Sequence, residues 1–169
     1  MNCSMRQFLW CALALLAALP AAVRADDFEI AISVAMGDKT LESKETQASA
    51  LTEPMPERPV FRAAAGERLQ VAWRATNTSR AAELADVLVH FFVVEQEQAG
   101  QAKVPPLGAE ANVRHEGALS MDFKPSEKAA GRFSLTIDKP GAYLVRVETV
   151  GTAESHGHEH YTAMDLIVE

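Results

Sequence analysis

The stretch LTIDKPGAYLVRV at residues 135–147 carries the signal that decides the fold. Apolar and polar residues alternate up to Ile137, and apolar residues recur at every second position from Tyr143 to Val147. This period of two is typical of β-strands that bury one face. Lys139-Pro140-Gly141, between the two alternating segments, has the composition of a tight turn. The stretch therefore predicts two strands joined by a short turn.

Strand-like patterning recurs along most of the chain that follows residue 25. Turn-forming residues separate the strand-like segments, which lie within residues 26–34, 60–63, 68–76, 87–95, 113–123 and 162–169. Helical periodicity is almost absent. Seven to nine short strands of this kind predict an all-β fold, an antiparallel β-sandwich, formed by residues 26–169 as a single domain. Residues 36–59, which are rich in charges and hold three prolines, are expected to form a long polar loop.

The turn in residues 135–147 resembles a corner found in immunoglobulin-like sandwiches. In that corner an Asp, a Gly or Ala, and a Tyr precede the penultimate strand, and the Tyr hydroxyl bonds backbone a few residues upstream. Asp138, Gly141 and Tyr143 match this pattern. The resemblance implies an immunoglobulin-like β-sandwich with Trp73 in its core. Residues 140–147, a His-bearing loop and a final strand are also similar to exported bacterial domains of this architecture, some of whose relatives are associated with periplasmic metal handling.

Residues 1–25 have the pattern of a secretory signal peptide. Arg6 precedes an apolar run, and small residues end the segment at Val23-Arg24-Ala25. The run is much shorter than the roughly 20 residues that a membrane-spanning helix needs. We expect cleavage after Ala25, export to the periplasm or the extracellular space, and no membrane span in the mature chain.

Removing the predicted signal peptide changes the chemistry of the chain. Both cysteines, Cys3 and Cys11, lie within it, so a mature chain has no disulfide, no thiolate metal site and no cysteine nucleophile. Losing Arg6 and Arg24 takes the formal net charge from −7 to −9 at pH 7. An acidic surface repels phosphate backbones, so nucleic acid is not an expected partner.

A histidine cluster lies before the final predicted strand. In an extended backbone alternate residues point the same way, so His156, His158 and His160 can share one face and bind Cu²⁺, Zn²⁺ or Ni²⁺. Glu159 is a further candidate ligand. His90 is interpreted either as another ligand or as a histidine that hydrogen bonds to a neighbour on a mostly apolar face. Weak incidental metal affinity, and no metal binding at all, stay open as alternatives.

The remaining polar residues suggest no catalytic site. Neither a His-Glu-x-x-His zinc motif nor a Gly-x-Ser-x-Gly nucleophile elbow occurs. His115, Asp122 and Asp165 are interpreted as surface residues. The sequence predicts a non-enzymatic exported β-sandwich that binds a protein, an envelope component or a small ligand. A periplasmic transition-metal binding protein is the alternative, and a hydrolase with an unrecognised carboxylate pair is the third hypothesis.

Overall fold

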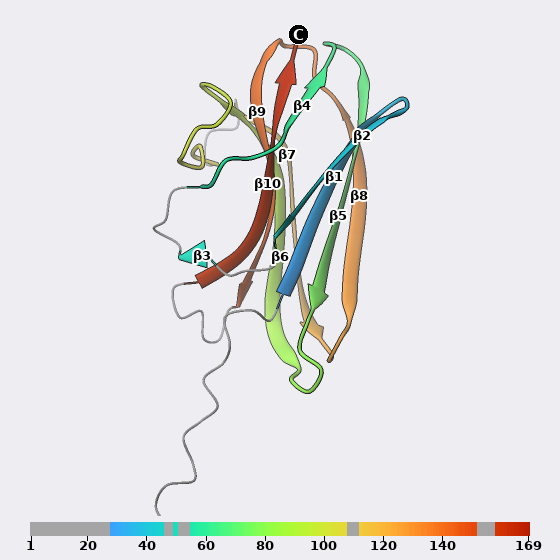
Figure 1. Ribbon diagram of the computed structural model, residues 1–169, viewed down its shortest axis with the longest axis vertical. Coiled ribbons are helices and arrows are strands. Elements are labelled where there is room, and N and C mark those ends of the chain that lie inside the picture. The colour runs from blue at the N-terminus through green and yellow to red at the C-terminus, as the bar shows by residue number, and fades with distance from the viewer. Residues whose placement is uncertain (1–27, 46–48, 51–54, 108–111, 152–157) are drawn as a thin grey trace, which may run out of the picture.

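The computed structural model describes residues 28–45, 49–50, 55–107, 112–151 and 158–169, and the predicted signal peptide lies outside these ranges. Within them the chain is all-β, as predicted, and helices are absent (Figure 1). No helix that could cross a membrane occurs in the same ranges. Of the ten strands in this part of the chain, nine are longer than two residues, which fits the predicted seven to nine. The strands are β1 (Phe28–Met36), β2 (Lys39–Glu45), β3 (Ser49–Ala50), β4 (Val60–Ala63), β5 (Arg68–Asn77), β6 (Leu84–Gln96), β7 (Val113–Phe123), β8 (Lys128–Thr136), β9 (Gly141–Gly151) and β10 (His158–Val168).

The strands form two sheets that pack face to face (Figure 1). The small sheet has the order β2-β1-β5-β8, and the large sheet has the order β3-β10-β9-β6-β7, with β4 paired to β10 as well. The strand pairs are antiparallel, as predicted, except that β4 runs parallel to β10. The chain therefore crosses between sheets several times, including from β5 to β6 and from β7 to β8.

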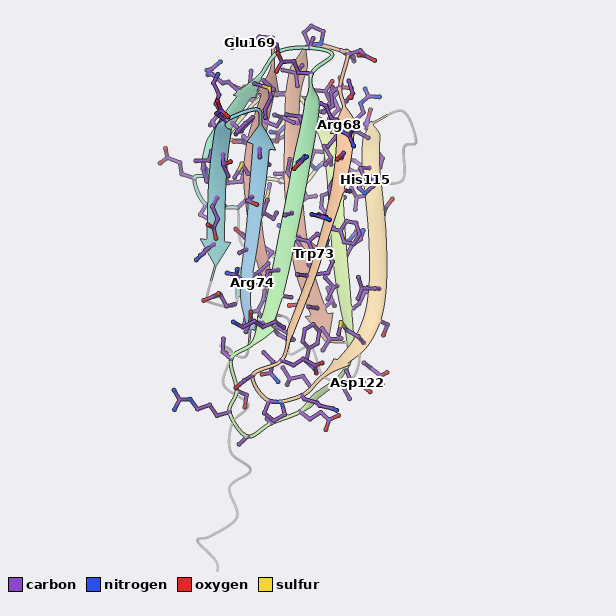
Figure 2. All side chains as sticks on the ribbon, turned by 90° about the vertical axis from the view of Figure 1, so that its right-hand side faces the viewer. Arg68, Trp73, Arg74, His115, Asp122 and Glu169 are labelled. Atoms are coloured by element: carbon purple, nitrogen blue, oxygen red, sulfur yellow. The ribbon has the colours of Figure 1, made fainter. Side chains whose placement is uncertain are left out.

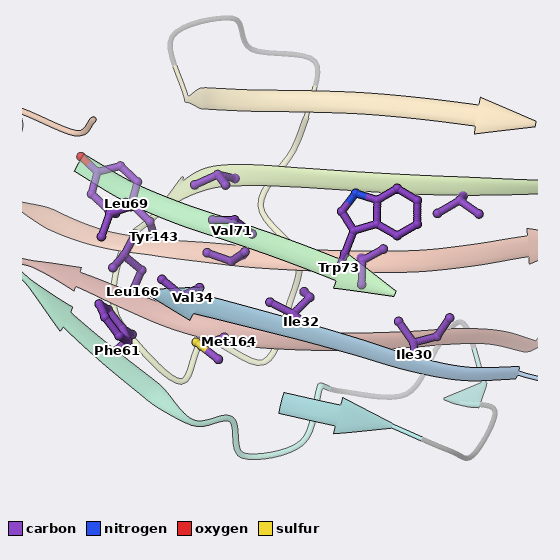
Figure 3. Close-up of a cluster of buried hydrophobic side chains, with 14 of the residues drawn as sticks. Ile30, Ile32, Val34, Phe61, Leu69, Val71, Trp73, Tyr143, Met164 and Leu166 are labelled. Carbon is purple, nitrogen blue, oxygen red and sulfur yellow. The ribbon is translucent and has the colours of Figure 1, made fainter. Parts of the chain in front are cut away.

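The core lies between the sheets and is built from the alternating apolar residues of each strand (Figure 3). Trp73, predicted to be a core residue, is 6% exposed. Burying such side chains contributes about 25 cal/mol for each Å² of apolar surface removed from water. The other labelled core residues are Ile30, Ile32, Val34, Phe61, Leu69, Val71, Tyr143, Met164 and Leu166.

Residues 135–147 form the end of β8, a turn and the start of β9, as predicted. The hydroxyl of Tyr143 donates a hydrogen bond to the carbonyl oxygen of Lys139 at 2.7 Å, and Tyr143 is fully buried. This is the contact that the Asp138, Gly141 and Tyr143 pattern predicts. It fixes the corner at which the chain passes from the small sheet to the large one.

Residues 36–59 differ from the expected long polar loop. Gly37, with φ of +55°, and Asp38 form a tight turn, and β2 then pairs with β1. The charged residues Glu42 and Lys44 point outward, whereas Leu41 and Ser43 are half-buried. The high charge of the segment conceals this alternation, because only two positions of β2 turn toward the core.

Candidate functional site

The two long sides of the sandwich differ in how they are closed. On one side β1 and β2 contact β10, and Ser43 Oγ lies 2.9 Å from Thr162 Oγ1 across the two sheets. On the other side the last strands are β7 and β8, and no ladder joins them in the described part of the chain. We call the β7 and β8 side the open side.

The open side, which lies at the right-hand edge of Figure 2, contains a cleft of about 570 Å³ between the two sheets. Inward-facing side chains of β7 and β8, such as Leu119, Met121 and Phe133, are half-buried, whereas those of β1 are fully buried. The cleft therefore exposes apolar surface to solvent. Its lining consists of Trp73, Phe91, His115, Leu119, Met121, Ala129, Ala130, Gly131, Arg132 and Phe133.

Four aromatic rings from four different strands stack at one end of the cleft. Trp73 of β5 stacks on Phe91 of β6, with 5.4 Å between ring centroids. His115 of β7 stacks on Phe133 of β8 at 3.8 Å, and Phe91 lies about equally far from both of these rings. We call these four residues the ring cluster. Near-parallel rings in partly open positions form a flat apolar wall against which a ligand group can pack.

Two glycines allow the rings to lie flat on neighbouring strands. Gly131 pairs with Trp73, and a Cβ atom at Gly131 would lie 2.6 Å from the indole ring. Gly117 pairs with Phe91, and a Cβ atom there would lie 2.4 Å from the phenyl ring. Glycine inside a strand marks such close approaches, so Gly117 and Gly131 are the sequence signal that could have indicated the ring cluster.

The expectation that His115 is a surface residue is wrong. Its ring is half-buried against Phe133, and burial lowers the pKa of the imidazole below its ordinary value. The charged neighbours Arg114 and Glu116 suggested a solvated segment. Strand alternation nevertheless places His115 on the inward face of β7, together with Leu119 and Met121, where a neutral ring is favoured.

His90 lies on the outer face of the large sheet between two carboxylates. Its Nδ1 is 3.0 Å from Oε1 of Glu148, and its Nε2 is 3.0 Å from Oε1 of Glu116. The hydrogen bond to Glu148 raises the pKa of His90, burial opposes this rise, and the bond to Glu116 adds to it. The geometry agrees with the hydrogen-bonded interpretation of His90, and its role as a metal ligand stays a prediction.

Glu148 extends this network to the strands nearer the side where β1 and β2 contact β10, which we call the closed side. Its Oε2 accepts a hydrogen bond from Nε of Arg146 at 2.6 Å. The guanidinium of Arg146 in turn lies 3.8 Å above the ring of Tyr161 on β10. Burial acts to raise the pKa of Glu148, but the hydrogen bond from His90 and the charge and hydrogen bond of Arg146 together outweigh it, so the pKa lies below its ordinary value. The network therefore links β7, β6, β9 and β10 across the whole outer face.

The predicted metal cluster falls largely outside the described residues. His156 and the side chains of His158 and Glu159 are outside them, and the backbone of β10 at His158 and Glu159 pairs with β3. His160 is half-buried, with its ring 5.7 Å from that of Phe28. In the part of the chain that the structure describes, no three His, Cys, Asp or Glu side chains form a group suited to a metal ion. Metal binding by this cluster stays a prediction.

Asp165 is buried, contrary to the expectation of a surface residue. It is 1% exposed, and its Oδ1 accepts hydrogen bonds from Nε and Nη2 of Arg58 at 3.0 and 2.8 Å. Gln96 and the backbone of Gly100 also donate to it. Asp165 does face away from the core between the sheets, as its neighbours imply. However, irregular segments of the chain that include Arg58 and Gly100 cover this outer face, and their packing leaves no periodic signal in the sequence.

No protein-family model and no curated protein matches the chain. Among solved structures, the soluble domain of PmoD from Methylocystis sp. shares 15% identity at a TM-score of 0.45, over 83% of this chain and 90% of that one. A family 123 glycoside hydrolase from Clostridium perfringens shares 10% identity at a TM-score of 0.42, over 83% of this chain and 27% of the enzyme. A β-glucosidase from Listeria innocua shares 14% identity at a TM-score of 0.34, over 72% and 16%. All three TM-scores are below 0.5.

Proposed function

We propose that this protein is an exported, non-enzymatic binding domain of immunoglobulin-like type, and that its ligand binds in the cleft on the open side. The immunoglobulin-like assignment is supported by the buried corner at Tyr143, which begins the penultimate strand. Export is supported by the pattern of residues 1–25. The proposal that the protein binds a ligand rests on the cleft.

The size and lining of the cleft suit a binding site. Ligand sites commonly have volumes of about 300–1,000 Å³ and mostly apolar walls with a few polar groups. The cleft, at about 570 Å³, fits this range, and its polar lining residues in the described chain are His115, which faces inward, and Arg132, which is exposed on the outward face of β8. Apolar surface that the chain itself leaves half-covered is a common mark of an interaction site.

The same lining argues against catalysis in the cleft. General acid–base catalysis needs a titratable group that can reach the reacting atoms. Among the described residues, no carboxylate, serine or cysteine belongs to the cleft lining. The ring of His115 is stacked on Phe133, where burial favours its neutral form. Binding is therefore the function that these side chains support best.

Energy transfer from Trp73 tests the proposal, because Trp73 is the only tryptophan of residues 26–169 and lines the cleft. The probe is anilinonaphthalene sulfonate, an apolar fluorophore with one negative charge. We expect the mature protein to bind it with transfer from Trp73, and Ala129→Leu, which fills the cleft, to reduce that transfer strongly. The control is Ser134→Leu on the outward face of the same strand. Equal transfer in both variants would rule out the cleft as the binding surface.

A further inference from the structure

Strand β8 is the more accessible of the two edge strands on the open side. Its ladder with β5 runs without interruption from the Arg68 and Thr136 pair to the Thr76 and Lys128 pair. The ladder of β7 with β6 is irregular near both ends. Irregularities of this kind bend an edge strand and protect it from pairing. A long, regular edge such as β8 presents backbone groups that an added strand can pair with.

The large sheet extends beyond β8 on this side. Phe133 of β8 packs on Phe91 of β6 and on His115 of β7, so β8 lies opposite these two strands. Figure 2 shows β7 projecting past β8 at the edge of the sandwich. A strand added beside β8 would therefore lie over the inward face of β7. It would cover Leu119 and Met121, which are partly exposed in the chain alone.

A small residue on β8 leaves room for side chains of the added strand. Ala129 is an inward position of β8 that lines the cleft together with Leu119 and Met121, and its methyl group leaves space between the sheets, whereas the space over Gly131 is occupied by the ring of Trp73. The stacked rings of His115 and Phe133 close the cleft above Ala129. An added strand with large apolar residues at alternate positions would place them in the space beside Ala129, because alternate side chains point to one face.

The charges of β8 indicate which chemistry the added strand has. Lys128 and Arg132 are its only charged residues, and both are exposed on the outward face. Pairing of β8 with β8 of a second copy would bring only cations or neutral residues opposite one another, which disfavours self-association. A segment whose outward residues are acidic would instead pair with both cations.

We propose that β8 accepts an extended segment of a partner polypeptide by strand addition, with apolar residues alternating into the cleft and acidic residues beside Lys128 and Arg132. The proposal rests on the proposed function, because it assigns the chemistry of the ligand of the same cleft. Main-chain hydrogen bonds to β8 would supply affinity, and the alternating side chains would supply specificity.

A labelled peptide tests strand addition directly. The probe is an acetylated, amidated peptide of about ten residues in which Glu or Asp alternates with Val, Leu or Phe, a length that spans β8. Fluorescence anisotropy measures its binding to the mature protein. Two further peptides carry N-methyl groups on the backbone amides, one on its apolar residues and the other on its acidic residues. Since alternate amides of a strand point to opposite edges, we expect one N-methyl set to weaken binding at least about tenfold and the other to be tolerated.

Charge variants test the chemistry of the partner. Lys128→Glu combined with Arg132→Glu is expected to weaken peptide binding by about tenfold or more. The matched control is Arg62→Glu, a reversal of an exposed cation on β4. Amide hydrogen exchange in β8, and not in the distant edge strand β2, should slow in the complex. The proposal would be overturned if both N-methylated peptides bound equally well. It would also be overturned if a peptide with Lys in place of the acidic residues bound as well as the acidic peptide.

The outcomes separate this inference from the proposed function. If the naphthalene probe binds and Ala129→Leu displaces it, but the alternating peptide does not bind, strand addition fails and the cleft remains a binding site. If Ala129→Leu has no more effect on the probe than Ser134→Leu, the proposed function fails and the strand-addition proposal fails with it.

Discussion

The closed and open sides of the sandwich use the same two sheets in different ways. At the closed side β10 packs on β1 and β2, its free edge is covered in part by β3 and β4, and Ser43 bonds to Thr162 across the sheets. At the open side Gly117, Ala129 and Gly131 occupy inward positions, and the rings of Phe91 and Trp73 lie over the two glycines. The two sides therefore differ in their inward side chains as well as in the strands that cover them.

The largest expected difference lies between two leucine truncations. Leu166→Ala, on β10 at the closed side, removes a fully buried side chain and should lower the free energy of unfolding by about 2–5 kcal/mol. Leu119→Ala, on β7 at the open side, should cost less, about 1–2 kcal/mol, because Leu119 is already partly exposed. Urea denaturation of both variants measures the difference. Equal losses would show that the open side is as tightly packed as the closed side.

Filling a glycine position on the open side is expected to have the next largest effect. Gly131→Ala places a methyl group 2.6 Å from the ring of Trp73, so the indole must shift, at a cost of about 1–3 kcal/mol. The emission of Trp73 should change with it. Ala118→Val, on the outward face of β7, is the control and should change neither quantity. Unchanged emission in Gly131→Ala would contradict the close packing of Trp73 on β8.

The hydrogen-bond network on the outer face of the large sheet joins the two sides, and its contribution to the free energy of unfolding should depend on pH. His90 bonds to Glu116 on β7 and to Glu148 on β9. The folded pKa of His90 is above its ordinary value of 6.5, so its charged form stabilises the fold fully below pH 6.5. That contribution is lost as the pH rises through the folded pKa. Glu148 has the opposite behaviour, because its lowered pKa makes its contribution disappear at acidic pH.

His90→Gln tests this dependence. The variant should lose about 1.5 kcal/mol near pH 6 and clearly less near pH 9, as measured by urea denaturation at both values. His115→Gln is a control of opposite sign: burial lowers the folded pKa of His115, so its neutral form is favoured and the variant should lose no more stability near pH 6 than near pH 9. A loss by His90→Gln that is the same at both pH values would show that the charge of His90 does not hold the strands together.

The sequence contained the strands and the corner, but not the cleft. Alternation along residues 135–147 and the position of Tyr143 were sufficient for β8, β9 and the bond to Lys139, because these depend on neighbours along the chain. The ring cluster depends on the register of four strands that are distant in sequence. Alternation alone predicts which residues of a strand share a face, but it does not predict which other strand covers that face. Asp165 was misplaced for this reason, whereas His115 was misplaced because its charged neighbours were given more weight than the alternation.

The smallest expected effect concerns His160, which begins the closed-side packing of β10 and also belongs to the predicted metal cluster. His160→Phe retains an aromatic contact with Phe28 and should change the free energy of unfolding by less than about 0.5 kcal/mol in metal-free buffer. If the predicted metal site includes His160, Zn²⁺ should raise the melting temperature of untagged wild-type protein and not that of His160→Phe, because an ion bound only by the folded state stabilises that state. Elemental analysis of the same samples measures occupancy. Equal responses to Zn²⁺ would show that His160 is not a ligand of any bound ion.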